Sequence, residues 1–370
     1  MKLKKWCVFI LGWMSLLSFQ VLAEQTSNKV LMVVSSYGLE QGEKQPGYEF
    51  DEFAKAYLVF KANGLKVDIA SPSGGEVEAD KYNPDKPYNQ EVLADKAIMA
   101  KLKQTLKTSV VDPSDYAGVF VIGGKGAMFD LPKDKSLQRL IASVYQGKGA
   151  VGAVCHGPAA LVNVKLSDGS YLVADKAVNA FTNEEEKLFG KKWAPQFDFM
   201  LEDKLAERGA KFEKSDIMLS HVAVDERLVT GQNPSSSSET AIAFVRQLGI
   251  TPAPYQADQE EATMALIAGV LADDTWAEQE LEKNSAQYQL PLVGMYGYYY
   301  IKQAESKAEL THAVTLMKAA QAAINNPQLD MQIAKGYQKL GKKLQARKVL
   351  ETLLDKHPEL ETAKEMLASL

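Results

Sequence analysis

The chain has 370 residues, which is long enough for two domains or for one large domain with an appendage. Its hydrophobic content of 46% and its charged content of 24% are those of an ordinary globular protein. The formal net charge of −5 argues against general nucleic-acid binding, since such proteins carry basic surfaces, and we expect no nucleic-acid partner.

The first 23 residues are typical of a secretory signal peptide. Lysines occupy three of the first five positions, an apolar core covers residues 6–17, and residues 21–23 fit a small-residue cleavage site. The core is short for a membrane span, although an uncleaved anchor is the alternative. We therefore expect a mature chain that starts at Glu24 and is periplasmic or secreted. Cys155 would then be its single cysteine, a free thiol.

Short apolar runs alternate with helical patterns through the first part of the mature chain. Because parallel strands are buried on both faces, such runs read as strands, and the pattern predicts a flavodoxin-like parallel sheet covered by helices on both faces. The expected strands are 29–35, 66–70, 116–122 and 150–154, the expected helices are 48–63, 91–106 and 134–147, and residues 76–90 are expected to form a surface loop.

The pattern continues more weakly to residue 249. We expect a strand and turn over 173–181, a helix opened by the acidic run 182–186, an amphipathic helix over 197–208, a strand at 227–231 and a last helix over 236–247. The acidic run alone needs no catalytic explanation, because carboxylates are favoured in the first turn of a helix.

The composition changes after Gly249. Residues 251–254 read as a linker, and residues 258–370 are almost entirely helical in pattern and rich in Ala, Leu, Lys and Glu. The predicted division is a signal peptide at 1–23, an α/β domain at 24–249 and an all-α domain at 250–370. The end resembles a tetratricopeptide repeat, on the spacing of Tyr337, Gly341, Ala346, Leu350 and Pro358. These helices are a candidate surface for a protein partner; the alternative is a structural or dimerising appendage, and we expect a homo-oligomer.

Cys155 stands where the strand 150–154 runs into a turn with Gly157 and Pro158. Such a strand-to-helix turn places its central side chain on a strained, exposed corner, as in a nucleophile elbow. A helix N-terminus stabilises a thiolate, so we expect a lowered pKa for Cys155, with His156 as a second activator. The alternative is a small buried cysteine that only packs.

Glycines also follow the expected strand 116–122. Gly124 lies in this segment, where a backbone without side chains can approach a ligand and exposed amides could form part of an oxyanion hole. A glycine pair alone is a weak signal, since many turns contain one.

Residues 28–248 resemble the ThiJ/PfpI superfamily, within the class I glutamine amidotransferase-like fold, and its glyoxalase III and heat-inducible chaperone branch in particular. The resemblance rests on four segments and leaves the last 120 or so residues uncovered: Ala153–Ala159, Gly123–Pro132, Phe181–Glu186 and Val229–Pro234.

The resemblance implies a catalytic role for residues from separate parts of the chain. It implies a nucleophile at Cys155, a triad histidine at His156, and a triad acid at Glu186, with Glu185 as the second choice. It also implies an acid from the first long helix against the sulfur, at Glu52, with Glu49 as the fallback. Without the family, a solvated charge on a helix face would be the preferred interpretation of Glu52.

One position departs from the family pattern. The branch often has His where this chain has Lys125. A lysine beside the thiol could lower its pKa further or hold an anionic substrate, or it could point into solvent. The substitution puts direct transfer of the glyoxalase activity in doubt.

We therefore expect a lyase of the glyoxalase III type that acts on small reactive carbonyls and converts methylglyoxal to lactate. The alternatives are a cysteine-dependent hydrolase or amidase, and a stress chaperone that binds partners through its helical tail. No metal or organic cofactor is expected, because the four histidines show no clustered ligand spacing.

Overall fold

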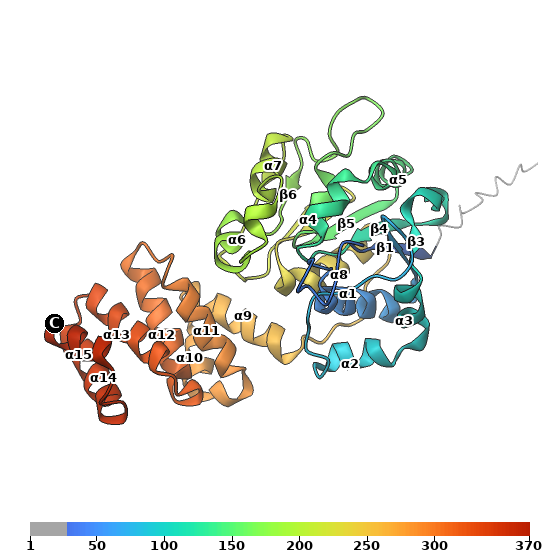
Figure 1. The fold of residues 1–370 in the computed structure, drawn as a ribbon. Helices are drawn as coiled ribbons and strands as arrows, with labels where there is room; N and C mark the ends of the chain where they lie inside the picture. Colours follow the sequence, from blue (N-terminus) through green and yellow to red (C-terminus); the bar gives the residue numbers. More distant parts are fainter. Residues whose placement is uncertain (1–27) are drawn as a thin grey trace, which may run out of the picture.

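The computed structural model describes residues 28–370, and it shows an α/β region followed by a run of helices (Figure 1). The predicted signal peptide and its cleavage site lie outside the described residues. Within residues 28–370, none of the helices combines the length and the apolar character needed to cross a membrane.

A seven-stranded sheet forms the centre of the described α/β region, in the order β3-β2-β1-β4-β5-β9-β8. All neighbouring strands are parallel except β8, which runs antiparallel to β9. The mostly parallel sheet confirms the predicted fold class, although β3 and β8 were not foreseen. The strands are β1 (Lys29–Val33), β2 (Lys66–Ser71), β3 (Leu106–Lys107), β4 (Gly118–Val121), β5 (Ala150–Val154), β8 (Val222–Asp225) and β9 (Leu228–Gly231).

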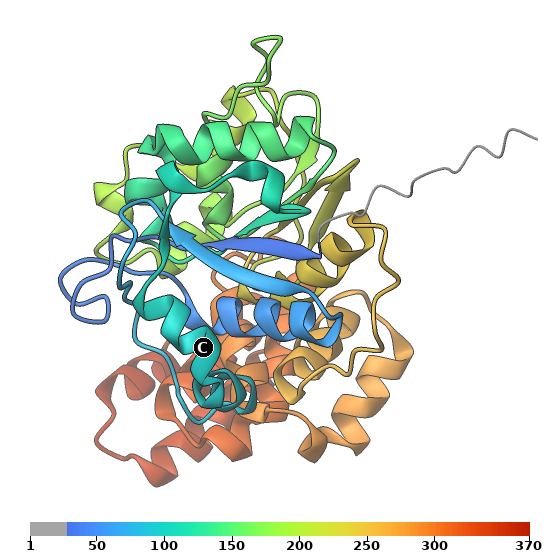
Figure 2. The ribbon, with the colours of Figure 1, turned by 90° about the vertical axis from the view of Figure 1, so that its right-hand side faces the viewer.

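Strands β4 and β5 are apolar at every position, and β1 is apolar after Lys29, because both faces of the sheet are covered. Successive side chains alternate between two hydrophobic clusters: Leu31 and Val33 of β1 belong to one cluster, and Val30 and Met32 belong to the other. Figure 2 shows α5 (Lys135–Gln146) on one side of the sheet and α1 (Phe50–Ala62) on the other. Helix α8 (Ser237–Gln247) packs on the same side as α1.

The helix predicted over 91–106 is wrong in its extent. The chain forms two helices there, α2 (Pro87–Ala94) and α3 (Lys96–Lys103), and the part of the expected loop 76–90 from Pro87 onward belongs to α2. Asp95 separates them because its backbone is extended, with ψ of 90°, and its side chain accepts from the amides of Ala97 and Ile98. An N-cap at this position therefore begins a second helix.

Two further predictions in the α/β region need correction. Only β6 (Ala177–Val178) is a strand within 173–181, and it pairs with β7 (Lys211–Phe212) in a separate two-stranded sheet. The helix expected over 197–208 is the shorter α7 (Leu201–Glu207). The remaining helices of this region are α4 (Ala127–Asp130) and α6 (Asn183–Phe189), with 3₁₀ turns η1 (Thr108–Val110), η2 (Pro113–Asp115), η3 (Leu131–Lys133), η4 (Gly157–Leu161), η5 (Ala194–Gln196) and η6 (Pro234–Ser236).

Helices make up the rest of the described chain and share a third hydrophobic cluster. Ile217 and Leu219, from the α/β region, are buried in this same cluster, so the two regions are packed together. The division at residues 249 and 250 stays a prediction. The helices are α9 (Gln259–Leu271), α10 (Thr275–Lys283), α11 (Leu290–Tyr300), α12 (Lys307–Ile324), α13 (Pro327–Lys339), α14 (Lys343–Lys356) and α15 (Glu361–Ala368), with η7 (Ser285–Gln287).

Candidate active site

Cys155 lies at the carboxyl end of β5, in the left-handed region of backbone conformation with φ of 58°. This conformation is unfavourable for a residue with a side chain and persists only where its surroundings hold it. The expected strained corner is therefore present. The element that follows is η4, a 3₁₀ turn of five residues rather than an α-helix, so fewer aligned amides face the sulfur than predicted.

The Cys155 side chain is buried, with 4% of the residue exposed, so the predicted exposed corner is wrong. Cys155 belongs to the hydrophobic cluster that includes Phe181, whose backbone amide donates to the Cys155 carbonyl at 2.9 Å. Neighbouring side chains thus cover the strand end. A substrate must be small, or the cover must move, for the sulfur to react.

Glu52 of α1 lies beside this sulfur. Its Oε2 accepts from the Gly123 amide at 2.8 Å, and its carboxyl interacts with the Cys155 thiol. Gly123 makes the approach possible: a Cβ there would lie 2.7 Å from Glu52 Oε2 and 2.8 Å from Cys155 Cβ. Oε1 of Glu52 is buried without a hydrogen-bond partner in the described chain. It is therefore an acceptor with unused capacity next to the thiol.

Burial raises the pKa of both groups. It is the largest cause of the raised pKa of Glu52, and it also holds the pKa of the Cys155 thiol well above its usual range, with the Glu52 charge adding to the effect. The expected lowering of the Cys155 pKa is therefore wrong for this buried thiol. A neutral Glu52 removes that repulsion, so the thiolate forms most readily beside a protonated carboxyl.

His156 joins the thiol to a second carboxylate. Its Nδ1 lies 3.5 Å from Cys155 Sγ, and its Nε2 lies 2.7 Å from Glu186 Oε2. Glu186 belongs to α6 and is buried, as is His156. The structure thus brings together Cys155, His156, Glu52 and Glu186, from three separate parts of the sequence.

Glu185, the second choice for the triad acid, has a structural position. Its side chain closes a capping box with Thr182 at the start of α6, and its Oε1 accepts from the Met218 amide at 2.7 Å and from Asn233 Nδ2 at 2.8 Å. These bonds fix α6 in the register that turns Glu186 toward His156.

Gly124 and Lys125 lie next to the site, after β4. Gly124 has φ of 94° and packs on the segment before α1, where a Cβ would lie 2.5 Å from the Glu49 nitrogen. Lys125 is half-buried, and its positive charge offsets part of the rise that burial causes in the pKa of both Glu49 and Asp80. The lysine therefore faces carboxylates at the edge of the site.

Glu49, the fallback for Glu52, is half-buried one helical turn earlier. Burial raises its pKa to about 7, and the charges of Asp51 and Asp80 add to the rise. Glu52 is the acid that meets the sulfur, while Glu49 belongs to the group around Lys125.

Sequence reasoning missed Asp80 and the rings around His156. Asp80 accepts from the Gly47 amide at 2.6 Å, and burial raises its pKa. It comes from a polar stretch that carries no motif. The rings of Phe181 and Phe197 lie 4.5 and 6.0 Å from the imidazole, centroid to centroid. Phe181 belongs to a segment that carried the resemblance, and its ring could have been suspected there.

No group of three or more His, Cys, Asp and Glu side chains among residues 28–370 is placed to hold a metal ion.

The fold and this constellation define a class: α/β proteins with a buried cysteine on a strained corner at the carboxyl end of a parallel strand. The chain belongs to the DJ-1/PfpI family, whose model matches residues 45–247.

Within the family, the chain is similar to glutathione-independent glyoxalases. It is 34% identical to the glutathione-independent glyoxalase hsp3102 of Schizosaccharomyces pombe, over 60% of this chain and 97% of the relative. It is 32% identical to glyoxalase 3 of Candida albicans, over 58% of this chain and 95% of the relative. The solved structure of glyoxalase III from Candida albicans superposes with a TM-score of 0.55 at 28% identity, covering 59% and 96% of the two chains.

Proposed function

We propose that this protein is a glutathione-independent glyoxalase that converts methylglyoxal and water to lactate. The observation that carries the proposal is the pairing of Cys155 with Glu52 on one side and with His156–Glu186 on the other, in a chain 34% identical to such a glyoxalase. The geometry provides a nucleophile and two proton-transfer groups within one buried site.

The first step is addition of the Cys155 sulfur to the aldehyde carbon. The thiol proton leaves to the facing Nδ1 of His156 or to Glu52, the C–S bond forms, and the aldehyde oxygen becomes the oxyanion of a hemithioacetal. Backbone amides near Gly124 and His156 would stabilise that oxygen, which then takes a proton.

The next steps move one proton between neighbouring carbons. Glu52 or His156 removes the hydrogen from C1 while the C2 oxygen takes a proton, which gives an enediol. A proton then returns to C2 and the C1 hydroxyl loses its proton, which leaves a lactoyl thioester on Cys155. Water then attacks the thioester, the C–S bond breaks, and lactate and the free thiol are released. A raised pKa lets Glu52 carry a proton in the buried site, as a role in proton exchange requires.

Lys125 would hold the ketone oxygen or the product carboxylate. Its half-buried position beside Asp80 and Glu49 keeps its charge at the edge of the site. An ammonium group suits this point-charge role, although the family often has His here.

The test is lactate formation from methylglyoxal without glutathione, for the wild type and for Cys155→Ala. We expect the variant to lose turnover while it keeps its fold. Activity that persists in Cys155→Ala would refute the mechanism. A parallel panel of amides and peptides distinguishes the hydrolase alternative, because amide cleavage without lactate formation would favour it.

We also propose that the protein is exported, on the strength of the charged, apolar and small-residue order in residues 1–23. The measurement is N-terminal sequencing of the protein from separated cell fractions. A cytoplasmic protein that retains residue 1 would contradict the proposal.

We propose that the final helices form a tetratricopeptide-like hairpin. α13 and α14 lie against each other, and Ala346 and Leu350 of α14 are fully buried, as the repeat spacing requires. A protein partner for this hairpin and a homo-oligomeric state remain proposals. Light scattering coupled to size-exclusion chromatography measures the oligomeric state. A protein that is monomeric at all concentrations would contradict the proposed homo-oligomer.

A further inference from the structure

The C-terminal helices touch the helix that carries Glu186. Phe189, one helical turn after Glu186 on α6, packs its ring edge-on against Tyr299 of α11, with 5.0 Å between ring centroids. Leu188 packs against the third hydrophobic cluster, which the C-terminal helices form. The end of α6 therefore contacts the C-terminal region as well as the sheet-side cluster, against which Phe189 also packs.

A second contact reaches the start of the same helix. The Met218 amide donates to Glu185 Oε1 at 2.7 Å, so the 217–219 loop holds the capping box of α6. Ile217 and Leu219 flank this amide and are buried in the cluster that contains Tyr296 of α11. The 217–219 loop, which fixes the register of Glu186, is thus packed against the C-terminal helices.

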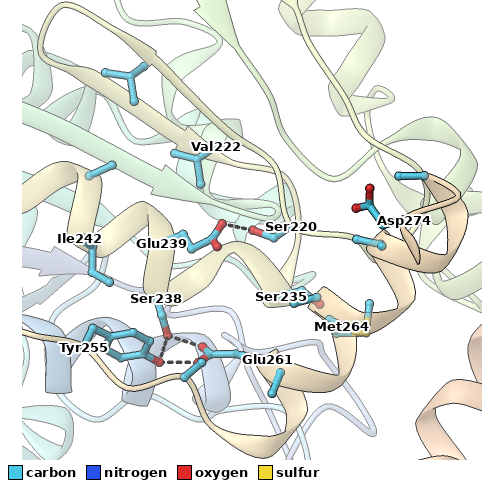
Figure 3. Close-up of a pocket in the computed structure, with 18 of the residues that line it drawn as sticks. Ser220, Val222, Ser235, Ser238, Glu239, Ile242, Tyr255, Glu261, Met264 and Asp274 are labelled. Atoms are coloured by element: carbon cyan, nitrogen blue, oxygen red, sulfur yellow. Dashed lines mark hydrogen bonds between the residues drawn. The ribbon is translucent and has the colours of Figure 1, made fainter. Parts of the chain in front are cut away.

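The C-terminal region also forms ion pairs with α1, the helix that carries Glu52. Lys55, one turn after Glu52 on α1, is 6% exposed, and its Nζ lies 3.2 Å from Asp258 Oδ2 and 3.4 Å from Glu261 Oε1, at the start of α9. Figure 3 shows Glu261 also bonded to Ser238 of α8 and to Tyr255. The two carboxylates and the buried lysine together fix the separation of α1 and α9. If α9 moved away, the Lys55 ammonium would remain buried without a partner, which is strongly destabilising.

We propose that the C-terminal helical region positions Glu186 and Glu52 against His156 and Cys155, through Tyr299 on α6 and through Asp258 and Glu261 on α1. The inference rests on the proposed function. It extends beyond that function, because the family model ends at residue 247 and the glyoxalase relatives match only about 60% of this chain. Tyr299, Asp258 and Glu261 act as positioning residues.

The experiment compares Tyr299→Ala with Tyr299→Phe in the full chain. Met295→Ala is the matched control, since Met295 lies on the same helix and is 40% exposed. Two readouts are taken: the kcat and KM for methylglyoxal, and the pH profile of Cys155 alkylation by iodoacetamide. Mass spectrometry on the Cys155 peptide follows the alkylation.

For Tyr299→Ala we expect kcat to fall about tenfold with KM nearly unchanged, because small displacements of catalytic groups cost up to ~10²-fold in rate. We expect the alkylation profile to move by about one pH unit, which is about tenfold in thiolate at a given pH. Tyr299→Phe keeps the ring contact and restores both values, and Met295→Ala matches the wild type. A merely structural contact would lower the melting temperature without moving the alkylation profile.

A folded Tyr299→Ala with the wild-type kcat and alkylation profile overturns the proposal. If Tyr299→Ala does not fold, Lys55→Arg and Lys55→Met decide instead. We expect Lys55→Arg to keep the profile and Lys55→Met to shift it, and wild-type profiles in both would overturn the proposal. Alkylation needs no carbonyl turnover, so a wild type that forms no lactate refutes the proposed function while the alkylation profiles still test the positioning.

Discussion

Glu186 and His156 meet through the imidazole nitrogen that is turned away from the sulfur, with 2.7 Å between Glu186 Oε2 and His156 Nε2. A carboxylate at this distance accepts a hydrogen bond from Nε2–H, which leaves the lone pair of Nδ1 facing Cys155 at 3.5 Å. The pairing therefore selects the tautomer that can take the thiol proton.

Replacing Glu186 by Gln removes this selection. The amide NH₂ can donate to Nε2 and leave the proton on Nδ1, which then no longer accepts from the thiol. We expect kcat/KM for methylglyoxal to fall about 10²-fold or more, as for other acids that orient a catalytic histidine. Glu184→Gln is the control, since Glu184 lies on the same helix and pairs with Lys214 near the surface. Equal activity in the two variants would contradict the role of Glu186.

The turn after β4 leads to a second prediction. Gly124→Ala would place a Cβ 2.5 Å from the Glu49 nitrogen at a φ of 94°. We expect a loss of about 2–3 kcal/mol in the free energy of unfolding, from strain and overlap together, and a fall in kcat because the neighbouring amides move. Gly64→Ala is the control: its φ is 70° and nothing lies within 4 Å of its Cβ. It should cost only about 1 kcal/mol, from backbone conformation alone. Urea unfolding that gives the same loss for both variants would show that the contact with Glu49 is unimportant.

The central strands were predictable because burial on both faces of a parallel sheet leaves continuous apolar runs. The 150–154 segment shows this best, since β5 has the bounds that its sequence indicates. Edge strand β8 was missed because it is only partly buried and its residues alternate between environments. The break at Asp95 was missed for another reason: Tyr57 and Lys61 of α1 bind its carboxylate, and such tertiary contacts leave no local signal.

The residues of the site were predictable from the sequence, whereas the burial of Cys155 and the direction of its pKa shift were not. The motif around Cys155 and the family resemblance named Glu52, His156 and Glu186, which the fold brings together. Burial of the sulfur and the direction of its pKa depend on what covers the strand end. Asp80 enters from a loop whose position depends on its bond to the Gly47 amide, and a single sequence does not reveal such a bond.

Glu49 gives a prediction for the pH dependence of stability. Burial raises its pKa from 4.5 to about 7 in the folded protein, so the folded state binds the extra proton between these values. Stability attributable to this group is therefore greatest below about pH 4.5 and falls as the pH rises to about 7. We expect the free energy of unfolding of Glu49→Gln, relative to that of the wild type, to be higher at pH 7.5 than at pH 5, as measured by urea unfolding. A difference between the two proteins that does not change with pH would contradict the raised pKa.

Asp95 predicts the opposite dependence on pH. Bonds from Tyr57 and Lys61 lower its pKa from 3.8 to about 2, so its contribution to stability is complete above about pH 4 and is lost as the pH falls toward 2.

Asp95→Ala removes these bonds and the cap of α3 together. We expect a loss of about 1–2 kcal/mol at pH 7, the usual cost of deleting an N-cap with its side-chain bonds. The difference from the wild type should shrink below pH 3, where the wild-type carboxylate is itself becoming protonated. The exposed Asp85 supplies the control, and Asp85→Ala should change the free energy of unfolding by less than about 0.5 kcal/mol. If Asp95→Ala behaves like Asp85→Ala in urea unfolding, then α2 and α3 are separated by something other than this cap.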